Sequence, residues 1–149
     1  MTEQRIRAVL DTNVIIAALK SKNPTSPTQE LLRRWGNDEF DLLYAADMRV
    51  EYAEKLIARQ VDSGKAAVFL NRLGQRGILV PLTEADLGPR IPDDPDDDVV
   101  IACAIAGGAT HLVTYDEHLH TLGEEYESVR ILDGLHFLYA LRGDVPPPH

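Results

Sequence analysis

Short apolar runs alternate along the chain with longer segments in which apolar residues recur at helical spacing. The first run ends with Val9 and Leu10, which suit a buried strand, and restarts after Asp11 as a helical pattern up to Leu19. Further strands are expected at residues 40–44, 78–82, 110–114 and 129–132. Further helices are expected at residues 28–35, 47–60, 63–75, 98–107 and 134–141. Strands that alternate with helices form parallel crossovers, so the pattern predicts a three-layer α/β/α fold around a parallel sheet of about five strands.

Polar residues at the segment boundaries indicate where several elements begin or end. Thr12 or Asn13 is expected to cap the first helix, because their side-chain oxygens accept amide protons at a helix start. Asp62 and Asp133 are expected to cap two later helices in the same way. Pro81 lacks an amide proton, so it places the third strand at a sheet edge or ends it.

The composition is that of one domain of ordinary size. Of the 149 residues, 44% are apolar, and we expect a single domain at 1–142 followed by a disordered tail at 143–149. Cys103 is the single cysteine, so an internal disulfide is excluded and a reducing compartment is expected. It lies in an apolar run, which favours a position in the core. The sequence shows neither a membrane-length apolar stretch nor the apolar segment of a signal peptide, so we expect a cytoplasmic protein that does not contact membranes.

The net charge of −9 argues against a protein that coats nucleic acid by bulk electrostatics, but it does not exclude a nuclease. Much of the excess negative charge is local, since five aspartates fall within residues 93–98. Bound divalent cations would offset part of this charge.

Four acidic residues are expected at one edge of the sheet. Asp11 follows the first strand, Glu51 lies early in the helix after the second, Asp98 opens the apolar helix and Asp116 follows the fourth strand. Ligands of such sheets bind beyond the carboxyl ends of the strands. Converging carboxylates repel one another without a cation, and their oxygens suit Mg²⁺ or Mn²⁺. The arrangement predicts a metal site for phosphodiester hydrolysis, in which metal activates water and stabilises charge on the phosphate.

Each acid also has a simpler explanation when taken alone. Backbone amides could satisfy Asp11, Glu51 could pair with Lys55 one turn later, Asp98 could cap its helix and Asp116 could begin a turn. All four explanations must hold together to remove the shared site, which makes the shared site the better hypothesis.

The motifs around these acids resemble those of PIN-domain proteins, in the order of that family and over nearly the whole chain. They are VLDTNV at 9–14, EY at 51–52, DPDDDVVIACA at 94–104 and HLVTYD at 111–116. The likeness is greatest to the bacterial and archaeal toxins of toxin–antitoxin pairs, including the VapC-like toxins. The resemblance implies a metal-dependent endoribonuclease whose metal ligands are Asp11, Glu51, Asp98 and Asp116. It also implies accessory polar roles for Thr12, Asn13 and Thr114, an antitoxin partner and a homodimer.

The sequence departs from the family's motifs at two positions. Ala45 stands where many members have a serine before the second acid, which removes a helix cap but no ligand. Leu119 stands three residues after the fourth acid, where many members have a further aspartate, with Glu117 and His118 between. The number of metals is therefore left open, as is the question of which of Asp96, Asp97 and Asp98 also contacts metal.

Other residues carry weaker signals. Positive charge is concentrated in the helices between the first and third acids, where it would either hold an RNA backbone or cover solvated helix faces: Arg33, Arg34, Arg49, Lys55, Arg59, Arg72 and Arg76. The five histidines lack the spacing of a structural zinc site. Trp35 and Phe69 are expected in the core rather than as base-stacking platforms.

Two other enzyme classes fit the sequence less well. A phosphatase that forms an aspartyl-phosphate usually needs a second acid two residues after the first, and this chain has Asn13 there. A receiver domain needs a lysine at the end of its last strand, and no lysine follows Leu132. The serious alternatives are a PIN-like module that binds a partner or nucleic acid without turnover, and a nuclease directed at DNA.

Overall fold

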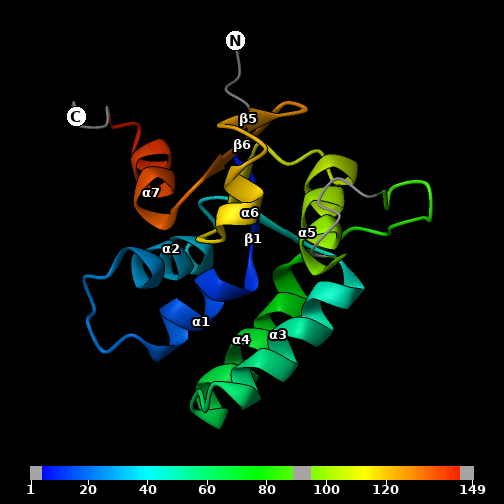
Figure 1. The fold of residues 1–149 in the computed structure, drawn as a ribbon. Helices are drawn as coiled ribbons and strands as arrows, with labels where there is room; N and C mark the ends of the chain where they lie inside the picture. The colour runs from blue at the N-terminus through cyan, green and yellow to red at the C-terminus, as the bar shows by residue number, and fades with distance from the viewer. Residues whose placement is uncertain (1–4, 89–94, 145–149) are drawn as a thin grey trace.

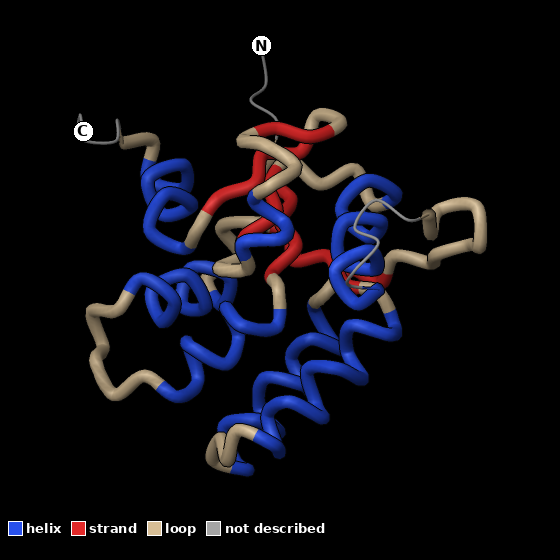
Figure 2. Tube along the Cα trace, in the orientation of Figure 1, coloured by secondary structure: helices blue, strands red, loops and turns tan. Residues whose placement is uncertain are grey.

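A computed structural model describes residues 5–88 and 95–144 of the chain. Its strands are β1 (Arg7–Leu10), β2 (Asp41–Tyr44), β3 (Ile78–Leu79), β4 (His111–Val113), β5 (Glu125–Tyr126) and β6 (Val129–Leu132). Its helices are α1 (Thr12–Lys20), α2 (Pro27–Gly36), α3 (Ala46–Ala58), α4 (Ser63–Arg76), α5 (Pro95–Ala106), α6 (Glu117–His120) and α7 (Gly134–Arg142). The strands run through the middle of the molecule with helices to both sides (Figure 2).

The six strands form one sheet in the order β3-β2-β1-β4-β6-β5. All neighbours are parallel except β5, which pairs antiparallel with β6. β1 lies between β2 and β4, so that Ala8 is in register with Leu42 on one side and His111 on the other. This central position buries β1 and brings the residues that follow β1 and β4 to the same edge of the sheet.

Helices cover the sheet on two sides, as the alternation of strands and helices predicted (Figure 1). α5 packs against β1, β2 and β4, whereas α7 packs against β4 and contacts α2, which in turn contacts α1. α3 and α4 pair with each other, and α3 also contacts α1 and α5. α3 thus lies where helices of the two layers meet, beside the carboxyl ends of β1 and β2. Among the described residues, no helix has the length and apolar character needed to cross a membrane.

The predicted caps are only partly confirmed. The carboxylates of Asp62 and Asp133 accept amide protons at the starts of α4 and α7, as expected. The cap expected from Thr12 or Asn13 is wrong, because α1 already begins at Thr12 and Asp11 caps it by accepting the amide proton of Thr12. At the start of α3, Ala45 makes no side-chain cap.

β5 and α6 were not predicted from the sequence, and the boundaries of β3 and α5 differ from the predicted ones. β5 is only two residues long, and its turn to β6 uses Glu127 and Ser128 at positive φ of 46° and 70° instead of the glycine or asparagine that signals such a turn. β3 ends at Leu79, with Pro81 soon after it at the edge of the sheet. α5 begins at Pro95, three residues before the expected start. Most of the tail predicted to be disordered lies outside the described residues.

Candidate functional site

Asp11 directly follows β1 and lies almost fully inside the protein, with 5% of its surface exposed. Its Oδ1 accepts the backbone N–H of Thr12 at 2.8 Å. Its Oδ2 accepts the hydroxyl of Thr114 at 2.7 Å and the side-chain amide of Asn13 at 3.3 Å. Two of the predicted accessory residues, Asn13 and Thr114, therefore hold the first acid in place.

The environment of Asp11 disfavours its negative charge. Burial raises the pKa of this carboxyl, and the hydrogen bonds from Thr114 and the Thr12 amide lower it only in part. The nearby carboxylates of Glu51 and Asp116 raise the pKa further by repulsion. The net shift is upward, so a cation bound among these acids would relieve an unfavourable charge.

Glu51 reaches the same place from α3. Its Oε2 accepts the hydroxyl of Thr12 at 2.8 Å, which links the second acid to the residue after the first. The next residue, Tyr52, is fully buried and donates its hydroxyl to the carbonyl oxygen of Leu10 at the end of β1. Tyr52 thus fixes α3 against β1, and Glu51 beside it is carried to Asp11.

Asp116 comes from the turn after β4. Its backbone N–H donates to Thr114 Oγ1 at 2.9 Å, so the hydroxyl that binds Asp11 also positions Asp116. The Asp116 Oδ1 accepts the backbone N–H of His118 at 2.8 Å and caps α6. The turn that the simpler explanation offered for Asp116 is therefore present, and it holds the carboxylate beside the other acids.

The third acid in this cluster is Asp97 and not Asp98, which the sequence analysis selected. Asp97 is 5% exposed and faces Asp116, whereas Asp98 is only partly buried and does not line the cavity that the acids share. Because α5 begins at Pro95, consecutive residues in its first turn project about 100° apart, and one of the three aspartates faces inward. Asp96 also lines the cavity but is exposed.

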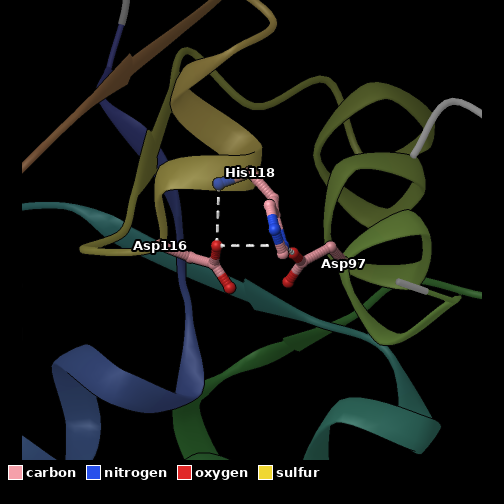
Figure 3. A group of neighbouring side chains, drawn as sticks. All are labelled: Asp97, Asp116 and His118. Atoms are coloured by element: carbon pink, nitrogen blue, oxygen red, sulfur yellow. Dashed lines mark hydrogen bonds and ion pairs between the residues drawn. The ribbon is translucent and has the colours of Figure 1, made fainter. Parts of the chain in front are cut away.

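His118 is a neighbour of these acids that the sequence analysis did not assign to the site. Its Nδ1 lies 3.6 Å from Asp116 Oδ1 and 3.8 Å from Asp97 Oδ2. Figure 3 shows its ring between the two carboxylates, one from the first turn of α5 and one from the cap of α6. The available signal was its place two residues after Asp116, in a first helical turn. Leu119 stands where many family members have a further aspartate. Its apolar side chain is fully buried, which excludes it as a ligand.

The acids open onto a cavity of about 400 Å³. Its lining combines carboxylates with two cationic side chains, one in α3 and one at its C-cap: Asp11, Thr12, Asn13, Ile16, Ala17, Glu51, Lys55, Arg59, Asp96, Asp97 and Asp116. Among the described residues, Glu51 and Lys55 do not form the ion pair that the simpler explanation required. The cavity thus holds acids that suit a cation and bases that suit a neighbouring phosphate.

A sequence model of the PIN domain matches residues 7–118, a segment that contains all four acids and most of the sheet. The chain belongs to the PIN domain family. PIN domains are generally nucleases, and the shared cavity of carboxylates in this PIN domain agrees with that chemistry. No curated protein matches the sequence.

Two solved structures resemble this PIN domain in fold. The crystal structure of FitAcB from Neisseria gonorrhoeae is 18% identical in sequence, with a TM-score of 0.55, covering 87% of this chain and 99% of that one. The structure of VapBC2 from Rickettsia felis, bound to a DNA fragment from their promoter, is 15% identical, with a TM-score of 0.60, covering 85% of this chain and 97% of that one. At these identities the likeness establishes the mixed α/β fold with a central, mostly parallel sheet.

Several basic residues of this PIN domain line one of two cavities. Lys55 and Arg59 line the acidic cavity, whereas Arg33 and Arg72 line a separate cavity between α1, α2 and α4. Arg34 forms ion pairs with Glu30, within α2, and with Glu39, which follows α2. Trp35 and Phe69 are buried and stack edge to face at 6.1 Å, which confirms their expected core positions.

The acidic residues of this PIN domain fit a divalent cation. Asp11, Glu51, Asp97 and Asp116 supply hard oxygen donors from four elements to one cavity. Asp97, Asp116 and His118 each offer a ligand atom, and these atoms all lie within 4.8 Å of one another. A buried aspartate with a raised pKa at the same place indicates that the cluster is short of positive charge.

Proposed function

We propose that this PIN domain is a metal-dependent endoribonuclease that hydrolyses RNA phosphodiester bonds and serves as the toxin of a toxin–antitoxin pair. One observation carries the nuclease proposal: four acidic side chains from separate elements line the cavity that Lys55 and Arg59 also border. We propose Asp11, Glu51, Asp97 and Asp116 as the metal ligands, with Asp97 in the role that the family resemblance gave to Asp98.

The side chains of the cavity would divide the work of hydrolysis. A divalent cation, Mg²⁺ or Mn²⁺, supplies activation of water and neutralises charge on the scissile phosphate. Thr114 and the Thr12 amide hold the Asp11 carboxylate at a fixed angle, and the Thr12 hydroxyl holds Glu51. Lys55 and Arg59 would bind phosphates that flank the scissile bond and so position the strand over the acids.

The first test is cleavage of a mixed-sequence structured RNA and of matched DNA by the purified protein. Each substrate is incubated with Mn²⁺, with Mg²⁺ or with EDTA, and the Asp11→Asn variant serves as the matched control. We expect RNA cuts that require metal and vanish in the variant, because the neutral amide is a weaker ligand at this buried position.

The other outcomes assign the alternatives. Metal-dependent cleavage of DNA alone would identify a DNA-directed nuclease. Cutting that persists in EDTA or in Asp11→Asn would contradict the acidic cavity as the active site. Binding of RNA without cleavage, by protein shown to be folded and free of partner, would favour a module that acts without turnover.

The antitoxin proposal rests on the family resemblance and on a second surface of the domain. Two adjoining cavities of about 630 and 490 Å³ lie between α1, α2 and α4 and share four lining residues: Leu19, Leu32, Lys65 and Arg72. Their apolar surface, which includes the half-exposed Val68, is bordered by cations in a protein whose net charge is −9. This combination suits an amphipathic segment with acidic residues, which we propose the antitoxin supplies.

Growth experiments test this role. Expression of the chain alone should arrest growth, Asp11→Asn should not, and the product of an adjacent small reading frame should relieve the arrest. Val68→Glu should retain RNA cleavage but escape relief, because it places a negative charge against the proposed acidic segment. An active nuclease that leaves growth unchanged would favour a free-standing RNA-processing enzyme.

A further inference from the structure

His118 occupies a place in the acidic cluster that a metal ligand would occupy. It extends from the first turn of α6 toward Asp97 and Asp116 (Figure 3). Of its side chain, 60% is exposed. Its Nδ1 is 3.6 Å from one carboxylate and 3.8 Å from the other. Both distances exceed those of a direct hydrogen bond.

These separations lie between the two that ligand atoms take around a single octahedral ion. Metal–ligand bonds of about 2.1 Å place neighbouring ligand atoms of an octahedral centre about 3.0 Å apart and opposite ones about 4.2 Å apart. The two Nδ1–oxygen distances, 3.6 and 3.8 Å, fall inside this interval. Small rotations of an exposed side chain would adjust them without any movement of the backbone.

We propose that His118 is a nitrogen ligand of the metal centre and that it biases this centre toward Mn²⁺ over Mg²⁺. This inference rests on the proposed function, since it concerns the same acidic cavity. Imidazole is a ligand for transition metals, whereas Mg²⁺ favours oxygen ligands and usually retains several of its waters. One nitrogen donor among carboxylates therefore shifts the preference of the site in a way that oxygen ligands alone do not.

The charge of the cluster also favours a histidine at this position. The four proposed carboxylate ligands, which line the cavity, already exceed the charge of one divalent ion. A neutral imidazole adds a ligand without adding a fifth negative charge. Leu119 cannot take this role because it is an apolar residue buried in the core.

Pulsed electron paramagnetic resonance of Mn²⁺ bound to the intact protein tests the assignment directly. Wild-type protein should show the modulation of a coordinated ¹⁴N nucleus, and labelling with ¹⁵N-histidine should convert it to the ¹⁵N pattern. His118→Ala should remove the signal and weaken Mn²⁺ binding about tenfold or more, since loss of even an outer partner of a ligand costs about 10- to 100-fold. His136→Ala is the matched control, because His136 also pairs with an aspartate, Asp133, at 2.7 Å but does not belong to the cluster of Asp97, Asp116 and His118.

His118→Asp provides a second readout that does not depend on activity. It should retain Mn²⁺ binding without the nitrogen signal and should raise the affinity for Mg²⁺ relative to Mn²⁺, as measured by calorimetry. Mn²⁺ that binds in wild-type protein without coupling to histidine nitrogen, or coupling that persists in His118→Ala, would overturn the assignment while leaving the carboxylate site intact. Failure of wild-type protein to bind Mn²⁺ at all would overturn both this inference and the proposed metal-dependent nuclease.

Discussion

The hydroxyl of Thr114 donates to the buried carboxylate of Asp11 at 2.7 Å, across a separation of 103 residues. The same oxygen accepts the backbone N–H of Asp116 at 2.9 Å. One side chain at the end of β4 therefore sets the positions of two acids from different parts of the sequence. β1 and β4 are neighbours in the sheet, and this pairing brings the three residues together.

Replacing Thr114 by valine should disturb the site more than the fold. The change keeps the shape of the side chain but removes both hydrogen bonds, so we expect a loss of about 1–3 kcal/mol in the free energy of unfolding. Mn²⁺ affinity should fall about 10- to 100-fold, because Asp11 and Asp116 lose their common support. Urea denaturation and calorimetry measure the two effects.

Thr110→Val is the matched control for this prediction. Thr110 precedes β4 at the opposite end, where its hydroxyl accepts from the Arg7 N–H and donates to the Arg7 carbonyl, both at 3.0 Å. This variant should lose stability and keep its metal affinity. Equal losses of metal affinity in the two variants would contradict the special role of Thr114.

Asparagine substitutions at adjacent positions should separate Asp97 from Asp98. Asp97→Asn should lower RNA cleavage by about 100-fold or more, since it removes a buried charge that faces Asp116. Asp98→Asn should retain activity within a few-fold of wild type, because Asp98 does not line the cavity. Single-turnover cleavage under identical metal concentrations provides the comparison. The reverse order of activities would restore Asp98 as the third ligand.

Lys55 and Arg59 should affect RNA binding more than the chemical step. Lys55→Ala and Arg59→Ala should each raise KM several-fold with little change in kcat, and each should reduce the salt dependence of binding by about 0.7 in the logarithmic slope. The reason is that each would lose one phosphate contact at the border of the cavity. Arg33→Ala and Arg72→Ala, in the cavity between α1, α2 and α4, serve as controls and should leave KM unchanged. A larger effect from the controls would move the RNA path to that cavity.

His111 should make the fold sensitive to mild acid. Burial, together with the nearby positive charge of Arg130, lowers the pKa of this imidazole to about 4, whereas the ordinary value in an unfolded chain is about 6.5. The unfolded state therefore binds the proton more tightly, so stability is fully present above pH 6.5 or so and falls as the pH drops toward 4. At pH 5 the loss amounts to about 2 kcal/mol.

The measurement is the free energy of unfolding in urea at pH 7.5 and pH 5. Wild-type protein should lose about 2 kcal/mol more over this interval than His111→Gln, which has no proton to gain. Parallel losses in the two proteins would show that His111 does not control the acid sensitivity.

The alternation of apolar strands and helical patterns was sufficient to predict the layered fold and the positions of Asp11, Glu51 and Asp116 at one edge. Asp11 and Asp116 come after the ends of strands, and Glu51 lies early in the helix that follows β2, so the parallel topology determines the edge at which they lie. Asp97 could not be selected in this way, because three consecutive aspartates lie in the first turn of a helix whose remaining residues are apolar on every side. The choice depended on where α5 begins, and Pro95 places that start earlier than the apolar pattern indicated.

The place of His118 beside the acids was not predicted for a different reason. α6 has only four residues and no apolar repeat, so the sequence gives no direction for its side chains. The contacts of His118 with Asp97 and Asp116 are tertiary, since they depend on α5 packing beside α6. The hairpin of β5 and β6 was missed because Glu127 and Ser128 adopt the positive φ angles that glycine and asparagine favour in such turns.

The sheet is terminated at both margins by strands of only two residues, β3 and β5. Long, flat margins invite backbone pairing with another molecule, and short ones offer little template for it. Pro81, close beyond β3, removes one more amide donor from that margin. Self-association through a sheet continued from one molecule into the next is therefore disfavoured, and a homodimer of this protein would use surfaces other than the margins of the sheet.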